Sequence, residues 1–195
     1  MKADGIILSA GFSSRAGGFK PELDIAGKPL LIRTIESMLD SCEKLIVVGG
    51  HEFERVARIL DGIPQCTAVK NENFRAGMFS SVKTGVNQVT AEKFFVLPGD
   101  QPAVSPSTFH HMMKENAEIV IPRYKGKKGH PVLFDACCIP GITAMEDTGI
   151  LRDYIHGRNN VTVIDVDDPG IGMDVDTPQD LVVVTDYYRK YRVKN

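Results

Sequence analysis

Short runs of consecutive apolar residues alternate along the chain with longer stretches in which apolar positions recur every three or four residues. Continuous apolar runs are typical of strands buried on both faces of a sheet, and the longer repeat is typical of helices that cover it. The pattern therefore predicts an α/β sheet with helices on both faces. The predicted strands are residues 5–8, 45–48, 66–69, 94–97, 118–122, 131–134 and 161–165.

Helices are predicted from apolar spacing and from capping residues. The apolar positions of residues 30–39 and of residues 53–60 each fall on one helical face. Ser105-Pro106 and Thr177-Pro178 each place a capping residue before a proline at the first helical position. They predict a helix that ends at 115 and a last helix that runs to about 191. Because no repeat or Pro/Ser-rich linker interrupts the pattern, we expect one domain over residues 1–195.

Composition excludes several classes of protein. The 195 residues are 43% hydrophobic and 25% charged, which is enough apolar material for a sizeable core and too much for a disordered chain. A net charge of -2 argues against nucleic-acid binding, and no apolar run approaches the roughly 20 residues of a membrane span. The first residues do not match a signal peptide, and the four cysteines form no C-x-x-C pair. We therefore expect a cytoplasmic protein with reduced thiols.

The loop after the first strand, residues 9–20, has the composition of an anion-binding segment. It contains three glycines, three serines, Arg15 and Lys20, and no acidic residue. Glycines let backbone N–H groups approach an anion, while arginine and lysine supply charge, so the loop suits a polyphosphate. It matches neither the Walker pattern nor G-x-G-x-x-G. Taken alone, it is equally compatible with a surface loop that carries two solvated cations.

Two acidic sites also follow predicted strands, where ligands bind in α/β sheets. Asp100 lies in the loop 98–102, and a carboxylate there suits Mg²⁺ beside a polyphosphate, although a turn-forming aspartate is the better interpretation of this loop alone. Asp174 and Asp176 are two residues apart and would share one face of an extended segment. Alternatively, Asp176 or Thr177 caps the last helix.

Two further segments hold polar groups at strand ends. Residues 71–81 offer amides, hydroxyls and helix N–H groups that could bind a base edge or an anion, or they form an ordinary helix start with Ser80 or Ser81 near the cap. Residues 126–131 form a basic turn that could receive an acidic substrate, or a solvated hairpin. The other histidines show no partner spacing: His51, His110, His111 and His156.

Together these segments resemble the motifs of small nucleotidyltransferases, in particular the molybdenum cofactor cytidylyltransferase-like branch of the MobA-like NTP transferases. The matches run in order from residue 5 to about 181. Residues 8–20 are similar to L-x-A-G-x-S-x-R-M-G-x-x-K, 27–30 to G-K-P-L, 97–102 to G-D-x-P, 129–134 to G-H-P-x-x and 174–178 to D-x-D-T-P. Asn71 and residues 77–83 are also similar to this branch. Ala16 departs from the usual methionine, and Ser9 from alanine or threonine.

The resemblance implies a three-layer α/β/α, Rossmann-like nucleotidyltransferase fold with a mostly parallel mixed sheet. It implies Mg²⁺-dependent transfer of CMP from CTP to the phosphate of molybdenum cofactor by direct in-line attack, with release of pyrophosphate. Arg15, Lys20 and Asp100 would be catalytic, and Asp100, Asp174 and Asp176 would hold the metal. The nucleotide would contact Ala10, Gly11, Ser13, Ser14, Arg15, Lys20, Asn71, Gly77, Ser80, Ser81 and Gly99, and the acceptor would contact Gly129, His130 and Pro131.

Other activities fit parts of the same pattern. Relatives that transfer GMP typically have A-G-G in place of residues 9–11 and N-x-N-T-P in place of residues 174–178, so both segments favour CTP over GTP. The acceptor could instead be a sugar or polyol phosphate. The chain could also be a silent molybdopterin-binding chaperone for a molybdenum hydroxylase, or a nucleotide sensor, but retention of Arg15, Lys20 and both acidic sites argues against the chaperone. A transient contact with such a hydroxylase is a further expectation.

Overall fold

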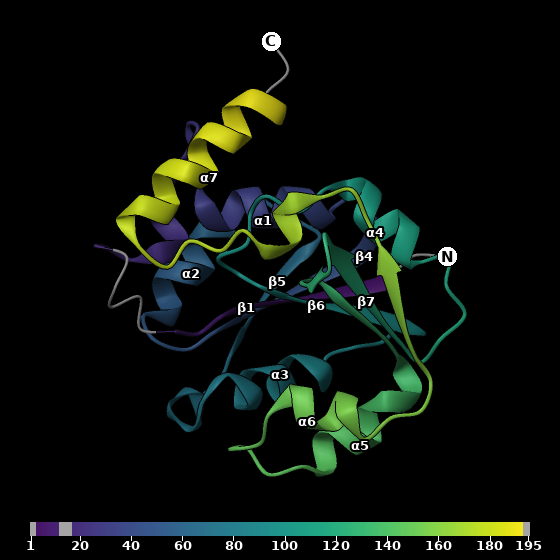
Figure 1. Cartoon of the computed structure of the whole chain (residues 1–195). Coiled ribbons are helices and arrows are strands. Elements are labelled where there is room, and N and C mark those ends of the chain that lie inside the picture. Colours follow the sequence, from purple (N-terminus) through teal and green to yellow (C-terminus); the bar gives the residue numbers. More distant parts are fainter. Residues whose placement is uncertain (1–2, 12–16, 193–195) are drawn as a thin grey trace.

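The computed structural model describes residues 3–11 and 17–192 of the chain (Figure 1). Within these ranges one mixed sheet has the order β10-β7-β9-β6-β1-β4-β5, with β8 on β7. Its strands are β1 (Ala3–Ser9), β4 (Cys42–Gly49), β5 (Cys66–Lys70), β6 (Lys93–Pro98), β7 (Ile119–Tyr124), β8 (Lys127–Lys128), β9 (Val132–Asp135) and β10 (Val161–Asp165). A separate small sheet pairs β2 (Asp24–Ile25) with β3 (Lys28–Pro29).

The pairing of the strands decides which loops meet. Strands β5, β4, β1 and β6 are parallel neighbours, and β10 is parallel to β7. Strand β9 runs antiparallel between β6 and β7. The residues that precede β9 therefore lie near the carboxyl ends of β1 and β6, together with the residues that follow those two strands. The expected mostly parallel, mixed sheet is confirmed.

Helices cover both faces of the sheet and complete three layers (Figure 1). On one face lie α1, α2, α4 and α7, and on the other lie α3, α5 and α6. This confirms the α/β/α arrangement. The helices are α1 (Leu30–Met38), α2 (Phe53–Ile59), α3 (Met78–Val86), α4 (Pro106–Met112), α5 (Ile139–Ala144), α6 (Leu151–His156) and α7 (Pro178–Tyr191).

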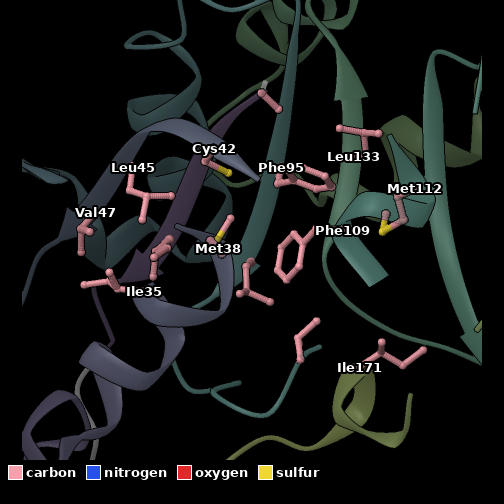
Figure 2. Close-up of a cluster of buried hydrophobic side chains, with 14 of the residues drawn as sticks. Ile35, Met38, Cys42, Leu45, Val47, Phe95, Phe109, Met112, Leu133 and Ile171 are labelled. Carbon is pink, nitrogen blue, oxygen red and sulfur yellow. The ribbon is translucent and has the colours of Figure 1, made fainter. Parts of the chain in front are cut away.

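Each face of the sheet has its own apolar core. Figure 2 shows the cluster in which Met38 of α1 and Phe109 of α4 pack on the sheet with Leu45 and Phe95. The rings of Phe95 and Phe109 meet edge to face, with centroids 5.1 Å apart, which is a favoured aromatic geometry. On the other face, α3 packs so closely that a Cβ on Gly85 would lie 2.5 Å from a methyl carbon of Ile6.

The two proline-started helices begin as predicted but differ in their capping. The Thr177 hydroxyl accepts from the Asp180 N–H, and the Asp180 carboxylate accepts from the Thr177 N–H, which forms a capping box at α7. Ser105 precedes α4 but makes no side-chain cap. Helix α4 ends at Met112 rather than at 115, because the N–H groups of residues 114 and 115 bond to carbonyls three residues back and tighten the chain into turns.

The structure also bears on the expected reduced thiols and on membrane-spanning segments. The four cysteines are not joined in disulfides, and Cys42 and Cys138 are buried. Among the helices of the described ranges, none combines the length and the apolarity that crossing a membrane requires.

The close packing of α3 on the sheet predicts that replacing Gly85 by alanine destabilises the protein, although helix propensity alone would predict stabilisation. We expect Gly85→Ala to lower the free energy of unfolding by about 1–3 kcal/mol, because the added methyl overpacks the contact with Ile6. Gly157→Ala is the matched control, since a Cβ there would lie 3.6 Å from its nearest neighbour. Urea denaturation checks both variants, and equal stability would contradict the close packing of α3.

Candidate functional site

Two adjoining cavities open at the carboxyl ends of β1 and β6. The first has a volume of about 370 Å³ and is bounded by the ends of β1 and β6 and by residues 74–81. The second, of about 680 Å³, lies between the sheet and helices α3 and α6. Both cavities share a wall made of Leu8, Gly77, Met78 and Pro98. Two ligands bound side by side would therefore meet at this wall.

Most of the described residues expected to bind the nucleotide gather in the first cavity. Its lining includes Ala10, Gly11, Lys20, Gly77, Ser81, Gly99 and Asp100. Asn71 and Ser80 are buried behind it and do not line it. Ser13, Ser14 and Arg15, expected from the sequence to bind the nucleotide, lie outside the described residues.

Lys20 joins two carboxylates that are distant in the sequence. Its Nζ lies 2.9 Å from an oxygen of Asp100 and 2.6 Å from an oxygen of Asp176. Burial opposes the charge of Lys20, but the hydrogen bonds to Asp176 and Asp100 outweigh this effect, so its pKa lies above the ordinary range. The two carboxylates therefore converge on one cation.

Backbone contacts hold the two acidic segments together. The N–H of Val175 donates to the carbonyl of Asp100 over 3.0 Å, and the Val175 side chain is buried. Asp176 consequently lies beside Asp100 and Lys20. Asp174, on the other side of Val175, is exposed and makes no hydrogen bond or ion pair with any residue in the described ranges.

The Asp100 loop passes very close to the end of β1. The Gly99 N–H donates to the Leu8 carbonyl over 2.8 Å, and a Cβ on Gly99 would lie 2.9 Å from that oxygen. On its other side, the buried Thr34 hydroxyl of α1 donates to the Gly99 carbonyl. Only glycine fits this close approach, which aims Asp100 into the first cavity.

The polar residues before α3 form a network of their own. The amide of Asn71 donates to the hydroxyls of Ser80 and Ser81 over 2.8 and 2.9 Å, and its oxygen accepts from the Asn73 N–H. The Ser80 hydroxyl also donates to the Gly77 carbonyl. Asn71 and Ser80 therefore shape the turn whose residues line the cavity, while Gly77 and Ser81 reach the cavity itself.

The second cavity receives the segment that precedes β9. Gly129 and His130 line it, whereas Pro131 is buried and does not. The His130 N–H donates to the Ile171 carbonyl over 2.8 Å, and a Cβ on Gly129 would lie 2.2 Å from the same oxygen. The turn thus packs backbone to backbone against the segment that leads to Asp176.

His130 is the titratable group most enclosed by this cavity. Burial lowers the pKa of its imidazole, and the charge of Asp100 only partly opposes this effect. Its Nδ1 is buried and has no hydrogen-bond partner among the described residues. The unpaired nitrogen of a neutral imidazole can donate or accept one hydrogen bond, depending on the tautomer, and is therefore available to a ligand.

A second group of potential metal ligands lies elsewhere, where the side chains of Glu118, Cys137 and Cys138 come within 4.8 Å of one another. Burial raises the pKa of both thiols, that of Cys137 to about 12, so both are protonated at neutral pH. Arg158 already pairs with the Glu118 carboxylate. A metal would have to displace these protons, so this group is poorly prepared for one.

Several residues of the two cavities had no role assigned to them individually from the sequence. Arg75 lines the first cavity, and Arg152 and His156 line the second. Met78, which lines both, is 66% exposed. The four-residue spacing of Arg152 and His156 was a weak signal, because it places both on one face of a helix only if residues 151–156 are helical.

Comparisons with known proteins agree with this geometry. The model of the MobA-like NTP transferase domain matches residues 5–162. The chain is 27% identical to the molybdenum cofactor cytidylyltransferase of Escherichia coli K12 over 95% of this chain and 96% of that protein. It is 26% identical to Rv0371c of Mycobacterium tuberculosis H37Rv, whose crystal structure superposes with a TM-score of 0.80 over 95% of this chain and 99% of that one. A structure of Rv0371C in complex with manganese superposes with a TM-score of 0.76 at 24% identity, covering 95% of this chain and 99% of that one.

The fold is that of a nucleotidyltransferase. The chain belongs to the MobA-like NTP transferase family.

The burial of His130 predicts its behaviour on titration. We expect its imidazole to titrate below the ordinary value of about 6.5, because burial penalises the charged form. The unfolded state then binds the proton more readily, so His130 lowers stability as the pH falls below the unfolded value. Histidine NMR resonances, assigned with His130→Asn, measure the titration. A midpoint at or above 6.5 would contradict the lowered pKa of His130.

Proposed function

We propose that the chain transfers CMP from CTP to the phosphate of a molybdopterin-type acceptor and releases pyrophosphate, with Mg²⁺ as the metal. The observation that carries this proposal is the shared wall of the two cavities, with Lys20, Asp100 and Asp176 beside it. One cavity offers charged groups and backbone to a triphosphate, and the other offers a larger, mostly apolar space to an acceptor.

The residues present fit a divalent cation. Two carboxylate oxygens converge on a single ammonium nitrogen, within 2.9 Å of it, so one cation can be reached by both. Mg²⁺ is commonly bound by one or two carboxylates together with substrate phosphates. When bound, the metal supplies positive charge that offsets the repulsion between the triphosphate and the acceptor phosphate. The manganese complex of the Rv0371C structure supports a divalent ion in this fold.

Positioning is the main task of the protein in this reaction, because the acceptor phosphate is already an anion and needs no strong base. Lys20 can turn from the carboxylates to the triphosphate once a cation neutralises Asp100 and Asp176. The backbone at Ala10 and Gly11 borders the same space. An acceptor phosphate at the shared wall would attack the α-phosphorus in line, and the bond to the leaving pyrophosphate would break.

The choice of CTP rests on the small size of the nucleotide cavity and on the relatives. Phe74 packs against Gly50 so tightly that a Cβ on Gly50 would lie 2.5 Å from the Phe74 Cβ. This contact fixes one wall of a cavity of about 370 Å³, and a pyrimidine needs less room there than a purine. The similarity to a cytidylyltransferase over 95% of the chain supports the same choice.

Thermal unfolding with each nucleotide tests the proposal. We expect CTP with Mg²⁺ to raise the melting temperature by about 5–10 °C at about 100 times its dissociation constant, because ligand that binds only the native state stabilises it by mass action. GTP, ATP and UTP, each with and without Mg²⁺, are the comparisons. A larger rise in melting temperature with GTP than with CTP would contradict the choice of CTP. A rise with CTP that is equally large without Mg²⁺ would contradict the requirement for Mg²⁺.

Two aspartates close in sequence provide a matched test of the metal site. We expect Asp176→Asn to remove most Mg²⁺-dependent pyrophosphate release, as Asp100→Asn should, because both carboxylates meet at Lys20. Asp174→Asn should retain most activity, since that side chain is exposed and does not contact Lys20. Pyrophosphate release with a molybdopterin acceptor, together with the melting temperature of each variant, measures this. Equal losses of pyrophosphate release in the Asp174→Asn and Asp176→Asn variants would indicate that both carboxylates bind the metal.

A further inference from the structure

The second cavity carries positive charge without any acid to balance it. Four of its lining side chains are basic or can become so: Lys128, His130, Arg152 and His156. Among the described residues that line it, none is acidic. Its floor and walls are apolar, with side chains from β6, β7, β9, α3 and α6. Such a lining is complementary to a ligand that has a broad apolar body and carries negative charge.

Arg152 is unusual among the arginines of the chain. Of the arginines in the described ranges, only Arg75 and Arg152 have side chains that make neither a hydrogen bond nor an ion pair with another described residue. Each of the two lines one cavity. The other arginines are engaged by carboxylates or carbonyl oxygens. An unpaired guanidinium at a cavity wall has its full set of donors available to a ligand.

Helix α6 presents Arg152 and His156 together. They lie four residues apart on the helix and line the same cavity, which Lys128 of β8 borders from another side. The side chains of Lys128 and His156 make no hydrogen bond or ion pair with a residue that the structure describes. The three groups line only the second cavity, whereas Lys20 and Asp100 line only the first.

We infer that Lys128, Arg152 and His156 form a second anion subsite, which binds a negatively charged group of the acceptor other than the phosphate that reacts. This inference rests on the proposed function, because it takes the second cavity as the acceptor site. The acceptor class is then a flat ring system with an anionic group at each end. One end reaches the shared wall beside Asp100, and the other lies against α6.

The exposed apolar side chains at the cavity fit such a body. Met78 is 66% exposed and Ile150 is 58% exposed, and both line the second cavity. Met78 comes from α3, and Ile150 directly precedes α6. Large apolar side chains left in water near a cavity are typical of surfaces that a ligand covers. A flat ring system between α3 and α6 would cover them and bring its charged group to Arg152.

Two fluorescent pterins that differ only in the substituent at position 6 test the subsite. 6-Carboxypterin carries an anion on the ring, and 6-methylpterin is its neutral counterpart. We expect the protein to bind the carboxylate about tenfold more tightly, as measured by quenching of pterin fluorescence, because a charge-assisted contact is lost in the neutral probe. Arg152→Gln and His156→Gln should each bring the ratio toward one. Arg189→Gln, on the exposed side of α7, should leave it unchanged.

Each other outcome overturns the inference. Equal binding of the two probes, binding of neither probe, or a ratio that survives Arg152→Gln would show that these residues do not form an anion subsite. A ratio lost with Lys20→Gln instead would assign the carboxylate to the position of the reacting phosphate. Neither pterin has a phosphate to react, so binding of the probes does not depend on catalytic turnover. The subsite and the proposed reaction can therefore fail independently: the pterin ratio tests the subsite, and the CTP-dependent melting shift tests the proposed function. Melting temperatures show that each variant is folded.

Discussion

The close backbone packing of residues 168–176 against the strand-end loops is the constraint on which the rest of the site depends. A Cβ on Gly170 would lie 2.0 Å from the Ala103 carbonyl oxygen, and a Cβ on Gly129 would lie 2.2 Å from that of Ile171. Buried Asp168 secures this segment by accepting from the Ser105 N–H, the Thr108 hydroxyl and the Gly170 N–H. The segment can therefore follow only one path.

That path brings like charges together. Once Val175 bonds to Asp100, the carboxylates of Asp100 and Asp176 must lie near each other in a partly buried place. Their repulsion requires a cation, and Lys20 provides it in the unliganded protein. The proposed metal and triphosphate would use the same arrangement, because Lys20 would be free to contact the phosphates when a cation lies between the two carboxylates. Stability without ligand and the proposed ligand binding would then depend on the same three side chains.

The layers of the fold could be predicted from the sequence because they depend on local pattern. Buried strands appear as continuous apolar runs, and the proline-led starts of α4 and α7 are visible in two-residue motifs. Helices α5 and α6 were not predicted, since each has six residues and α5 contains Pro140 and Gly141. Helices this short are stabilised by tertiary packing rather than by their own sequence.

The site was only partly predictable, because its contacts join residues far apart in the chain. Motif resemblance pointed to Lys20, Asp100 and Asp176, but it treated Asp174 and Asp176 alike, and only the burial of Val175 separates them. Arg152 has no motif to mark it. Its guanidinium, like that of Arg75, has no hydrogen-bond or ion-pair partner among the described residues, which is visible only after the fold has engaged the other arginines. An unpaired guanidinium at a cavity wall is what the proposed anion subsite requires, and the fold rather than any sequence motif places it there.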